Sequence, residues 1–256
     1  MKGPHHSVSA PPHGPAPKSL SVFFPAYNEQ DNLPTLIERT VAAVEPLTGD
    51  YEIIIVNDGS KDRTGEVAEE LARMNSRVRV VHHPRNMGYG AAVITGFAAA
   101  TKDAVFFSDS DNQFDLAEIK TFWELIGQHD AVVGYRIRRA DPFVRKVNAF
   151  CWGRLVRVLL GFRIRDLDCG FKMFRRSAVG GLTLSSRGAT VTAELMARLH
   201  RRGVRWVEVG VHHYPRTAGQ QTGARLKVIF RAFIELFRLK RRLAREAREG
   251  PAGGRA

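Results

Sequence analysis

The chain has 256 residues, of which 44% are hydrophobic, and it carries 39 Lys and Arg against 26 Asp and Glu. This length and apolar content fit one substantial α/β domain or two small ones, which excludes a wholly disordered protein. Two cysteines, Cys151 and Cys169, cannot form a disulfide framework, and no secretory leader pattern opens the sequence, so we expect a cytoplasmic protein. No apolar run reaches the roughly 20 residues of a membrane-spanning helix.

The net charge of +13 is distributed unevenly along the chain. Residues 1–133 hold 11 Lys and Arg against 18 Asp and Glu, whereas residues 134–256 hold 28 against 8. An acidic half suits a metal ion or sugar hydroxyls, and a basic half suits a phosphorylated partner, nucleic acid or an anionic membrane. Composition alone leaves these partners open.

The order of predicted elements indicates an α/β fold. Residues 1–18, rich in proline and histidine, predict a disordered tail, and residues 19–223 predict one domain. Strands are expected at Leu20–Phe24, Tyr51–Val56, Val78–His82, Ala104–Ser108 and Ala131–Gly134. Helices are expected at Leu33–Val44, Asp62–Met74, Gly90–Thr101 and Leu116–Gly127. The near-continuous apolar strands predict a doubly wound, mainly parallel sheet with helices on both faces.

The C-terminal part predicts a basic amphipathic helix over residues 224–248, followed by a disordered tail over residues 249–256. The segment Arg225–Glu249 holds nine Lys and Arg against three Glu. An apolar stripe runs along the predicted helix and comprises Ile229, Phe233, Leu236, Phe237 and Leu243. This stripe suits either an anionic membrane surface or docking on the chain's own domain. The segment Val144–Phe162, which mixes aromatic and basic residues, is a second candidate for membrane contact.

The turns after the strands are where a sheet of this kind binds ligands. The first turn, Pro25-Ala26-Tyr27-Asn28-Glu29, contains no glycine, which argues against a dinucleotide-binding fingerprint. The sequence contains neither GxxxxGK nor Gly-x-Ser-x-Gly, so a P-loop protein and a hydrolase with a nucleophile elbow are also excluded.

The strongest chemical signal is Asp109-Ser110-Asp111-Asn112-Gln113, directly after the expected strand Ala104–Ser108. Two carboxylates separated by one residue, with an amide two residues further on, present several oxygens to one hard divalent cation. The pattern indicates a Mg²⁺ or Mn²⁺ site, although an isolated Asp-x-Asp also serves as an ordinary polar turn. We expect Asp58 to end the neighbouring strand, to face solvent and to lie beside this turn.

Taken together, the motifs resemble those of the family 2 inverting glycosyltransferases. They are Pro25–Glu29, Val56–Thr64, Asn86-x-Gly88-x-Gly90 and Asp109-x-Asp111-x-Gln113. The later segment Asp166–Lys172 resembles the corresponding segment of the synthases that move a hexose from a sugar nucleotide to dolichyl or polyprenyl phosphate. The resemblance covers about residues 20–220 and implies a GT-A-like fold.

The resemblance also implies roles for the matching residues. The nucleotide sugar would be bordered by Pro25, Ala26, Tyr27 and Glu29, with Asp58 at the base or ribose and Asp109 at the ribose and diphosphate. A Mg²⁺ or Mn²⁺ ion would be held by Asp109, Asp111 and Gln113. The candidate bases are Asp166, then Asp168, and Glu194, which equally suits the role of dipole partner of its helix. Arg136 and Arg216 would hold phosphates.

The expected reaction is therefore hexose transfer from a GDP-mannose- or UDP-glucose-type donor to a polyprenyl or dolichyl phosphate. The basic half would give peripheral contact with an anionic membrane at its cytoplasmic face. One alternative is a glycosyltransferase acting on a glycan, a secondary metabolite or a protein. Another is a basic nucleic-acid-binding protein, but carboxylates at three strand ends would repel phosphate, so we expect no nucleic acid. The oligomeric state stays open.

Overall fold

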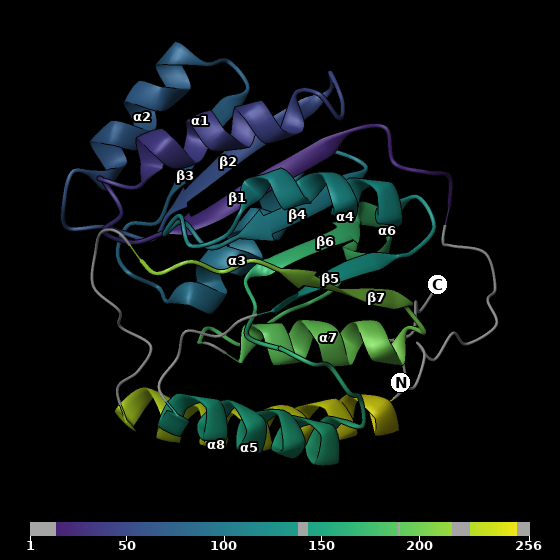
Figure 1. The fold of residues 1–256 in the computed structure, drawn as a ribbon. Helices are drawn as coiled ribbons and strands as arrows, with labels where there is room; N and C mark the ends of the chain where they lie inside the picture. The colour runs from purple at the N-terminus through teal and green to yellow at the C-terminus, as the bar shows by residue number, and fades with distance from the viewer. Residues whose placement is uncertain (1–13, 138–142, 189, 217–225, 250–256) are drawn as a thin grey trace, which may run out of the picture.

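The computed structural model describes residues 14–137, 143–188, 190–216 and 226–249, which build a seven-stranded sheet in the order β3-β2-β1-β4-β6-β5-β7 (Figure 1). The strands are β1 Leu20–Ala26, β2 Tyr51–Asn57, β3 Val78–His82, β4 Ala104–Ser108, β5 Ala131–Arg136, β6 Phe171–Arg175 and β7 Trp206–Val211. Strand β6 runs antiparallel to β4 and β5, and the other pairs are parallel. The predicted mainly parallel sheet is confirmed.

Helices cover both faces of the sheet, as predicted. They are α1 Leu33–Val44, α2 Thr64–Met74, α3 Tyr89–Ala99, the 3-10 turn η1 Leu116–Glu118, α4 Ile119–Ile126, α5 Phe143–Leu160, α6 Arg176–Val179, α7 Val191–Arg201 and α8 Leu226–Glu249. Because successive strand residues point to opposite faces, Phe24 joins the core under α1, α2 and α4, whereas Phe23 joins the core that α3 and α7 cover. The sheet is thus buried on both sides.

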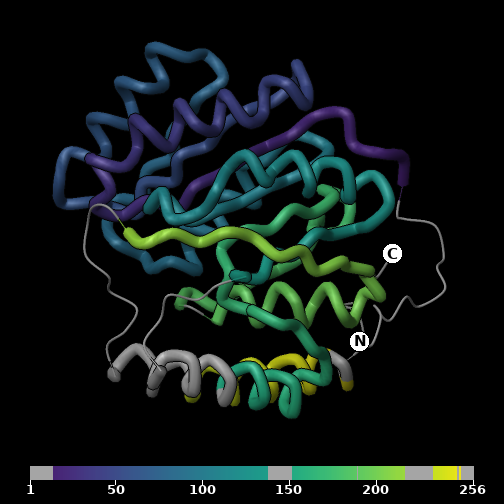
Figure 2. The backbone as a smooth tube through the Cα atoms, viewed as in Figure 1, coloured from purple at the N-terminus to yellow at the C-terminus, as the bar shows by residue number. Residues whose placement is uncertain are grey.

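An outer layer formed by α5 and α8 lies beneath α7 (Figures 1 and 2). Three leucines of α8, Leu236, Leu239 and Leu243, are buried in the same core as α7. Trp152 of α5 packs edge-on against Phe233 of α8, with the ring centroids 5.7 Å apart. Of the two uses that the sequence left open for the apolar stripe, docking on the domain is therefore realised.

Several element boundaries differ from the sequence-based ones. Strand β1 continues through Ala26 because it keeps parallel register with β2 up to Asn57. Strand β5 continues to Arg136 because it pairs with β7, a strand that local sequence patterns did not reveal. Helix α2 begins only at Thr64, since the Asp62 carboxylate accepts the Thr64 backbone N–H at 3.0 Å and remains outside the helix.

The N-terminal segment is ordered from Gly14 onward, contrary to the disorder predicted up to residue 18. The backbone N–H of Lys18 donates to Asp103 at 3.0 Å, and the Arg175 guanidinium donates to the Gly14 carbonyl at 2.9 Å. Residues 1–13 and 250–256, which make up most of the two predicted tails, lie outside the described residues. Within the described part of the chain, no helix is long and apolar enough to cross a membrane.

Candidate active site

The acidic turn after β4 is fastened to the end of β1. The Ser110 hydroxyl donates to the Pro25 carbonyl at 2.9 Å, and the Asn112 amide donates to the Asn32 carbonyl at 2.8 Å. Asn112 has a φ of 57°, in the left-handed region that asparagine tolerates. The turn is therefore fixed at the carboxyl end of the sheet with Asp109 and Asp111 both partly exposed.

Asp109 lies in a crowded electrostatic setting. Burial, together with the charge of Asp111, raises the pKa of Asp109 to about 6. The Tyr89 hydroxyl donates to Asp109 at 3.2 Å, and the pKa of Tyr89 is raised well above its usual range by burial and by Asp109, so the phenol stays a donor. On the other side lies Gly170, where an added Cβ would overlap the Asp109 carboxylate. A side chain at position 170 would therefore displace the Asp109 carboxylate.

The two aspartates fit a divalent cation. A bound cation would relieve the repulsion that raises the pKa of Asp109. The residues that the structure describes contain no group of three or more His, Cys, Asp or Glu suited to hold a metal ion. Two carboxylates are nevertheless sufficient for Mg²⁺ or Mn²⁺ when a substrate diphosphate and water supply the remaining oxygens.

Gln113, the third predicted metal ligand, contacts Tyr214 through its side-chain N–H and its backbone carbonyl, so the role of its side-chain oxygen as a metal ligand stays a prediction. Its side-chain N–H donates to the Tyr214 carbonyl at 2.8 Å, and its own carbonyl accepts the Tyr214 N–H at 2.7 Å. Gln113 thereby ties the acidic turn to the segment that follows β7. This segment also carries Arg216, whose predicted loop continues over residues 217–219, outside the described residues.

The first turn and Arg216 close the other side of the acidic turn. Arg216 forms an ion pair with Glu29, and its guanidinium lies 4.0 Å from the Asp111 carboxylate. Burial raises the pKa of Glu29, and its hydrogen bond with Asn32 and the ion pair with Arg216 offset only part of this rise. Tyr27 is half-buried. The predicted donor-site residues of the first turn therefore lie next to the acidic turn.

Asp58 corrects the sequence-based expectation. Strand β1 separates β2 from β4, so Asp58 does not end a neighbouring strand. The residue is only 3% exposed, so the expected solvent-facing position is wrong. Its carboxylate accepts hydrogen bonds from the His83 ring at 2.7 Å and from the backbone N–H groups of Met87 and Gly88 at 2.8 and 2.9 Å. Asp58 thus fixes the loop that leads into α3.

The two aspartates of the segment before β6 differ in their surroundings. Asp166 is buried and forms a two-pronged ion pair with Arg136, at 2.7 Å to Nε and 2.8 Å to Nη2. Asp168 is exposed. A base must reach its substrate, and by this criterion the exposed Asp168 is more accessible than Asp166, the base preferred from the sequence. Arg136, predicted to hold a phosphate, is engaged by Asp166.

Glu194 does not have the surroundings of a general base. Its side chain is fully buried in the first turn of α7. Although burial disfavours its charge, hydrogen bonds from Ser186 and Ser185 and the charge of Arg242 hold the pKa of Glu194 below its usual value. A base that is already saturated with hydrogen bonds cannot take a proton readily, so Glu194 has a structural use here.

Sequence reasoning missed Tyr89 and Lys172. Tyr89 lies within the motif Asn86-x-Gly88-x-Gly90, and its place at the start of a helix after a strand was the available signal. Lys172 is fully buried, and its ammonium donates to the Leu167 carbonyl at 3.1 Å and to that of Cys169. These hydrogen bonds from Lys172 hold the Asp166–Gly170 segment in place, and no local sequence pattern indicates them.

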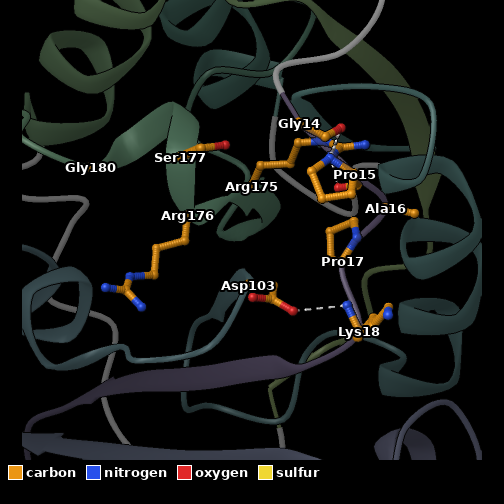
Figure 3. Close-up of a pocket in the computed structure, with 10 residues that line it drawn as sticks. All are labelled: Gly14, Pro15, Ala16, Pro17, Lys18, Asp103, Arg175, Arg176, Ser177 and Gly180. Atoms are coloured by element: carbon orange, nitrogen blue, oxygen red, sulfur yellow. Dashed lines mark hydrogen bonds between the residues drawn. The ribbon is translucent and has the colours of Figure 1, made fainter.

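A separate pocket, whose lining residues Figure 3 shows, includes residues that precede β1 and β4, at the ends of these strands opposite the acidic turn. It has a volume of about 680 Å³ and is lined by residues that include Lys18, Asp103 and Arg176. Asp103 precedes β4, whereas the acidic turn follows it. Ligands of parallel sheets bind at the carboxyl ends, so this pocket is not the candidate active site.

The comparisons with known proteins identify the family of the chain. The family described as "Glycosyl transferase family 2" matches residues 21–182, more than half of the chain. The chain belongs to this family and is a nucleotide-sugar-dependent glycosyltransferase.

Solved structures share the fold. One is glucosyl-3-phosphoglycerate synthase from Mycobacterium tuberculosis with phosphoglyceric acid, with a TM-score of 0.65 and 21% identity over 87% of this chain and 80% of that one. The same enzyme with Mn²⁺, UDP and glucosyl-3-phosphoglycerate gives a TM-score of 0.63 and 22% identity with the same coverage. A protein described only as mycobacterial gives 0.64 and 21%, covering 86% of this chain and 74% of that one. The GT-A-like α/β fold is thereby confirmed.

Proposed function

We propose that the chain transfers a hexose, with inversion, from a GDP-mannose- or UDP-glucose-type donor to a polyprenyl or dolichyl phosphate, with Mg²⁺ or Mn²⁺ as cofactor. The observation that carries this proposal is the carboxylate pair at the carboxyl end of β4. Burial and the neighbouring charge of Asp111 disfavour the ionised form of Asp109. A divalent cation bound between the two carboxylates would stabilise that ionised form.

The donor would occupy the edge of the sheet between the first turn and the acidic turn. Asp109 and Asp111 would hold the cation, which would supply positive charge for the departing diphosphate. Arg216, already within 4.0 Å of Asp111, meets the diphosphate. The nucleoside is bordered by Pro25, Ala26, Tyr27 and Glu29, and Asp58 acts on it through the Met87–Gly88 loop that it fixes.

The acceptor would approach from the side of Asp168. A phosphate monoester has a second pKa of about 6 and is largely a dianion at neutral pH, so it needs little help from a base. Asp168 is exposed and orients the acceptor, while the Asp166–Arg136 ion pair fixes the segment that carries it.

The outer layer supports a peripheral membrane contact at the cytoplasmic face. Val158 of α5 is 71% exposed, and Ile234 and Phe237 of α8 are 39% and 50% exposed. Exposed basic residues, among them Arg157, Arg238 and Arg241, lie on the same two helices. Apolar and basic side chains on one outer layer are typical of a protein surface that binds anionic lipid.

A small phosphorylated acid is the second candidate acceptor. Similar solved structures of glucosyl-3-phosphoglycerate synthase hold phosphoglyceric acid or glucosyl-3-phosphoglycerate. Both candidates offer a phosphate group, and they differ in whether the enzyme needs a lipid surface.

A transfer assay tests the proposal. GDP-mannose, UDP-glucose and UDP-N-acetylglucosamine are each offered with polyprenyl phosphate in anionic vesicles and, separately, with 3-phosphoglycerate, with and without chelator. We expect metal-dependent transfer from one donor to polyprenyl phosphate. Transfer to 3-phosphoglycerate alone would favour the second candidate, and transfer that persists in excess chelator would contradict the metal site.

A further inference from the structure

The Glu194 carboxylate joins three parts of the chain. It accepts backbone N–H groups from Ser185 at 3.0 Å and Ser186 at 2.7 Å, which lie in the segment before α7. It also binds Arg198 of its own helix at 3.0 Å and Arg242 of α8 at 3.3 Å. This fully buried carboxylate holds its partners in place, because removing it would leave several buried donors unpaired.

The segment held by Glu194 contacts the first turn of α3. The Gly90 N–H donates to the Arg187 carbonyl at 2.8 Å. A Cβ on Gly88 would lie 2.7 Å from this carbonyl, and one on Gly90 would overlap the Ser186 carbonyl. Both glycines are therefore needed for the close approach, and the residue between them is Tyr89, whose hydroxyl donates to Asp109.

Helix α8 holds the other end of the same segment. The Thr190 hydroxyl donates to Glu235 at 2.7 Å, and a Cβ on Gly188 would lie 2.8 Å from the Glu235 carboxylate. Glu235 and Arg242 are seven residues apart, about two helical turns, so they lie on one face of α8. Arg242 donates to the Ser186 hydroxyl at 3.5 Å, so this face of α8 contacts the segment at Ser186 as well as at Thr190.

We propose that Glu194 is a positioning residue, through which the docked helix α8 orders the first turn of α3 and thereby holds Tyr89 against Asp109. This inference rests on the proposed function of Asp109 as a ligand of the metal and donor. Glu194 itself touches no substrate. Helix α8 would then be a working part of the catalytic domain as well as the outer surface of the molecule.

The test compares two carboxylates that bind the same arginine. Glu194→Gln removes the negative charge of the buried carboxylate and keeps the size of the side chain. Glu246→Gln is the matched control, because Glu246 binds Arg198 at 2.9 Å, and its hydrogen bonds to the described residues go to Arg198 and not to Ser185 or Ser186. Amide hydrogen exchange at residues 88–92 and the Mn²⁺-dependent affinity for UDP and GDP are measured for both variants, well below their unfolding temperatures.

In Glu194→Gln we expect exchange at residues 88–92 to rise and nucleotide affinity to fall, each about tenfold, with both unchanged in Glu246→Gln. A purely structural role would lower the unfolding temperature and leave exchange and affinity as in the wild type, which would overturn the inference. Nucleotide binding by the wild type tests the proposed function, whereas the exchange difference tests the link, so the two can fail separately.

A second pair of variants guards against misfolding of Glu194→Gln. Arg242 is 32% exposed, so its replacement is milder. Arg242→Met should raise exchange at residues 88–92, and Arg242→Lys, which keeps a cation near Glu194, should restore much of the protection. Equal, wild-type exchange in both would contradict the link between α8 and α3.

Discussion

The carboxylate of Asp109 competes for protons with any cation that binds it. Its pKa in the metal-free protein is about 6, raised by burial and by Asp111. Below that pH, metal binding must displace a proton, so we predict that the apparent Mn²⁺ affinity falls by about tenfold per pH unit, and that it is nearly constant above about pH 7. Calorimetric titrations between pH 5 and about 8 measure this. A flat profile would mean that Asp109 is not a ligand.

Asp58 is predicted to act mainly on stability. Its buried carboxylate accepts three hydrogen bonds from the loop before α3, so Asp58→Ala leaves the Met87 and Gly88 N–H groups unpaired. We expect the free energy of unfolding to fall by about 2–4 kcal/mol. Urea denaturation measures the loss. A variant as stable as the wild type but with weaker nucleotide binding would instead assign Asp58 to direct contact with the nucleoside.

Among the elements, α8 allows the clearest comparison. Leu239 is fully buried, whereas Phe237 on the same helix is 50% exposed. Leu239→Ala should lower the free energy of unfolding by about 2–4 kcal/mol, because it removes buried methyl groups and leaves a cavity. Phe237→Ala should change it by less than about 1 kcal/mol and should instead weaken binding to anionic vesicles. The reverse pattern in thermal unfolding and vesicle sedimentation would argue against the docked helix.

Docking also changes what removal of the C-terminal helix should do. If residues 225–256 served membrane binding alone, their loss would reduce activity on a long-chain polyprenyl phosphate in anionic vesicles far more than activity on a short, water-soluble phosphate acceptor. With Leu236, Leu239 and Leu243 in the core beside α7, deletion exposes the domain interior. Activity on both kinds of acceptor should therefore be lost.

At the scale of the whole molecule, Glu52 ties several elements together. Its carboxylate accepts hydrogen bonds from Ser21 of β1 at 2.6 Å, from the Thr101 N–H at 2.8 Å and from Arg79 of β3 at 2.8 Å. Burial opposes its charge, but these bonds outweigh burial and lower the pKa of Glu52 to about 2 from its usual 4.5. The carboxylate is therefore stabilised by the fold.

A carboxyl group whose pKa is lower in the folded than in the unfolded protein stabilises the fold when it is ionised. This stabilisation is complete above the pKa of the unfolded chain, and it is lost as the pH falls toward the pKa of the folded protein. We therefore predict that Glu52→Gln lowers the free energy of unfolding by about 2–3 kcal/mol at pH 7, and that the difference from wild type disappears between about pH 4.5 and about pH 2. Denaturant titrations across this range measure it. A difference independent of pH would show that shape, not charge, matters at this position.

Local patterns in the sequence were sufficient to predict strands β1 to β5. The five predicted strands all exist, and two of them, Val78–His82 and Ala104–Ser108, have the predicted bounds. Strands β6 and β7 were missed because β6 is antiparallel and both depend on pairing with distant residues, which local periodicity cannot reveal.

In the candidate site, too, local motifs could be predicted and contacts between distant residues could not. The acidic turn and the first turn could be predicted because each is a continuous motif at a strand end. The ion pairs of Arg136 with Asp166 and of Arg216 with Glu29 could not, since they join residues far apart in the chain. The burial of Asp58 was missed for the same reason, because its partners come from the loop after β3.

The central claim is that Asp109 and Asp111 hold a cation that the nucleotide donor needs. Calorimetric titration of UDP and GDP into the wild type and into Asp111→Asn, each with Mn²⁺ and with chelator, tests it most directly. Asp111 is partly exposed, so the variant should keep its fold. We predict that Mn²⁺ strengthens binding of one nucleotide to the wild type by at least about tenfold and has little effect in the variant. Equal nucleotide affinity with and without metal in the wild type would contradict the account.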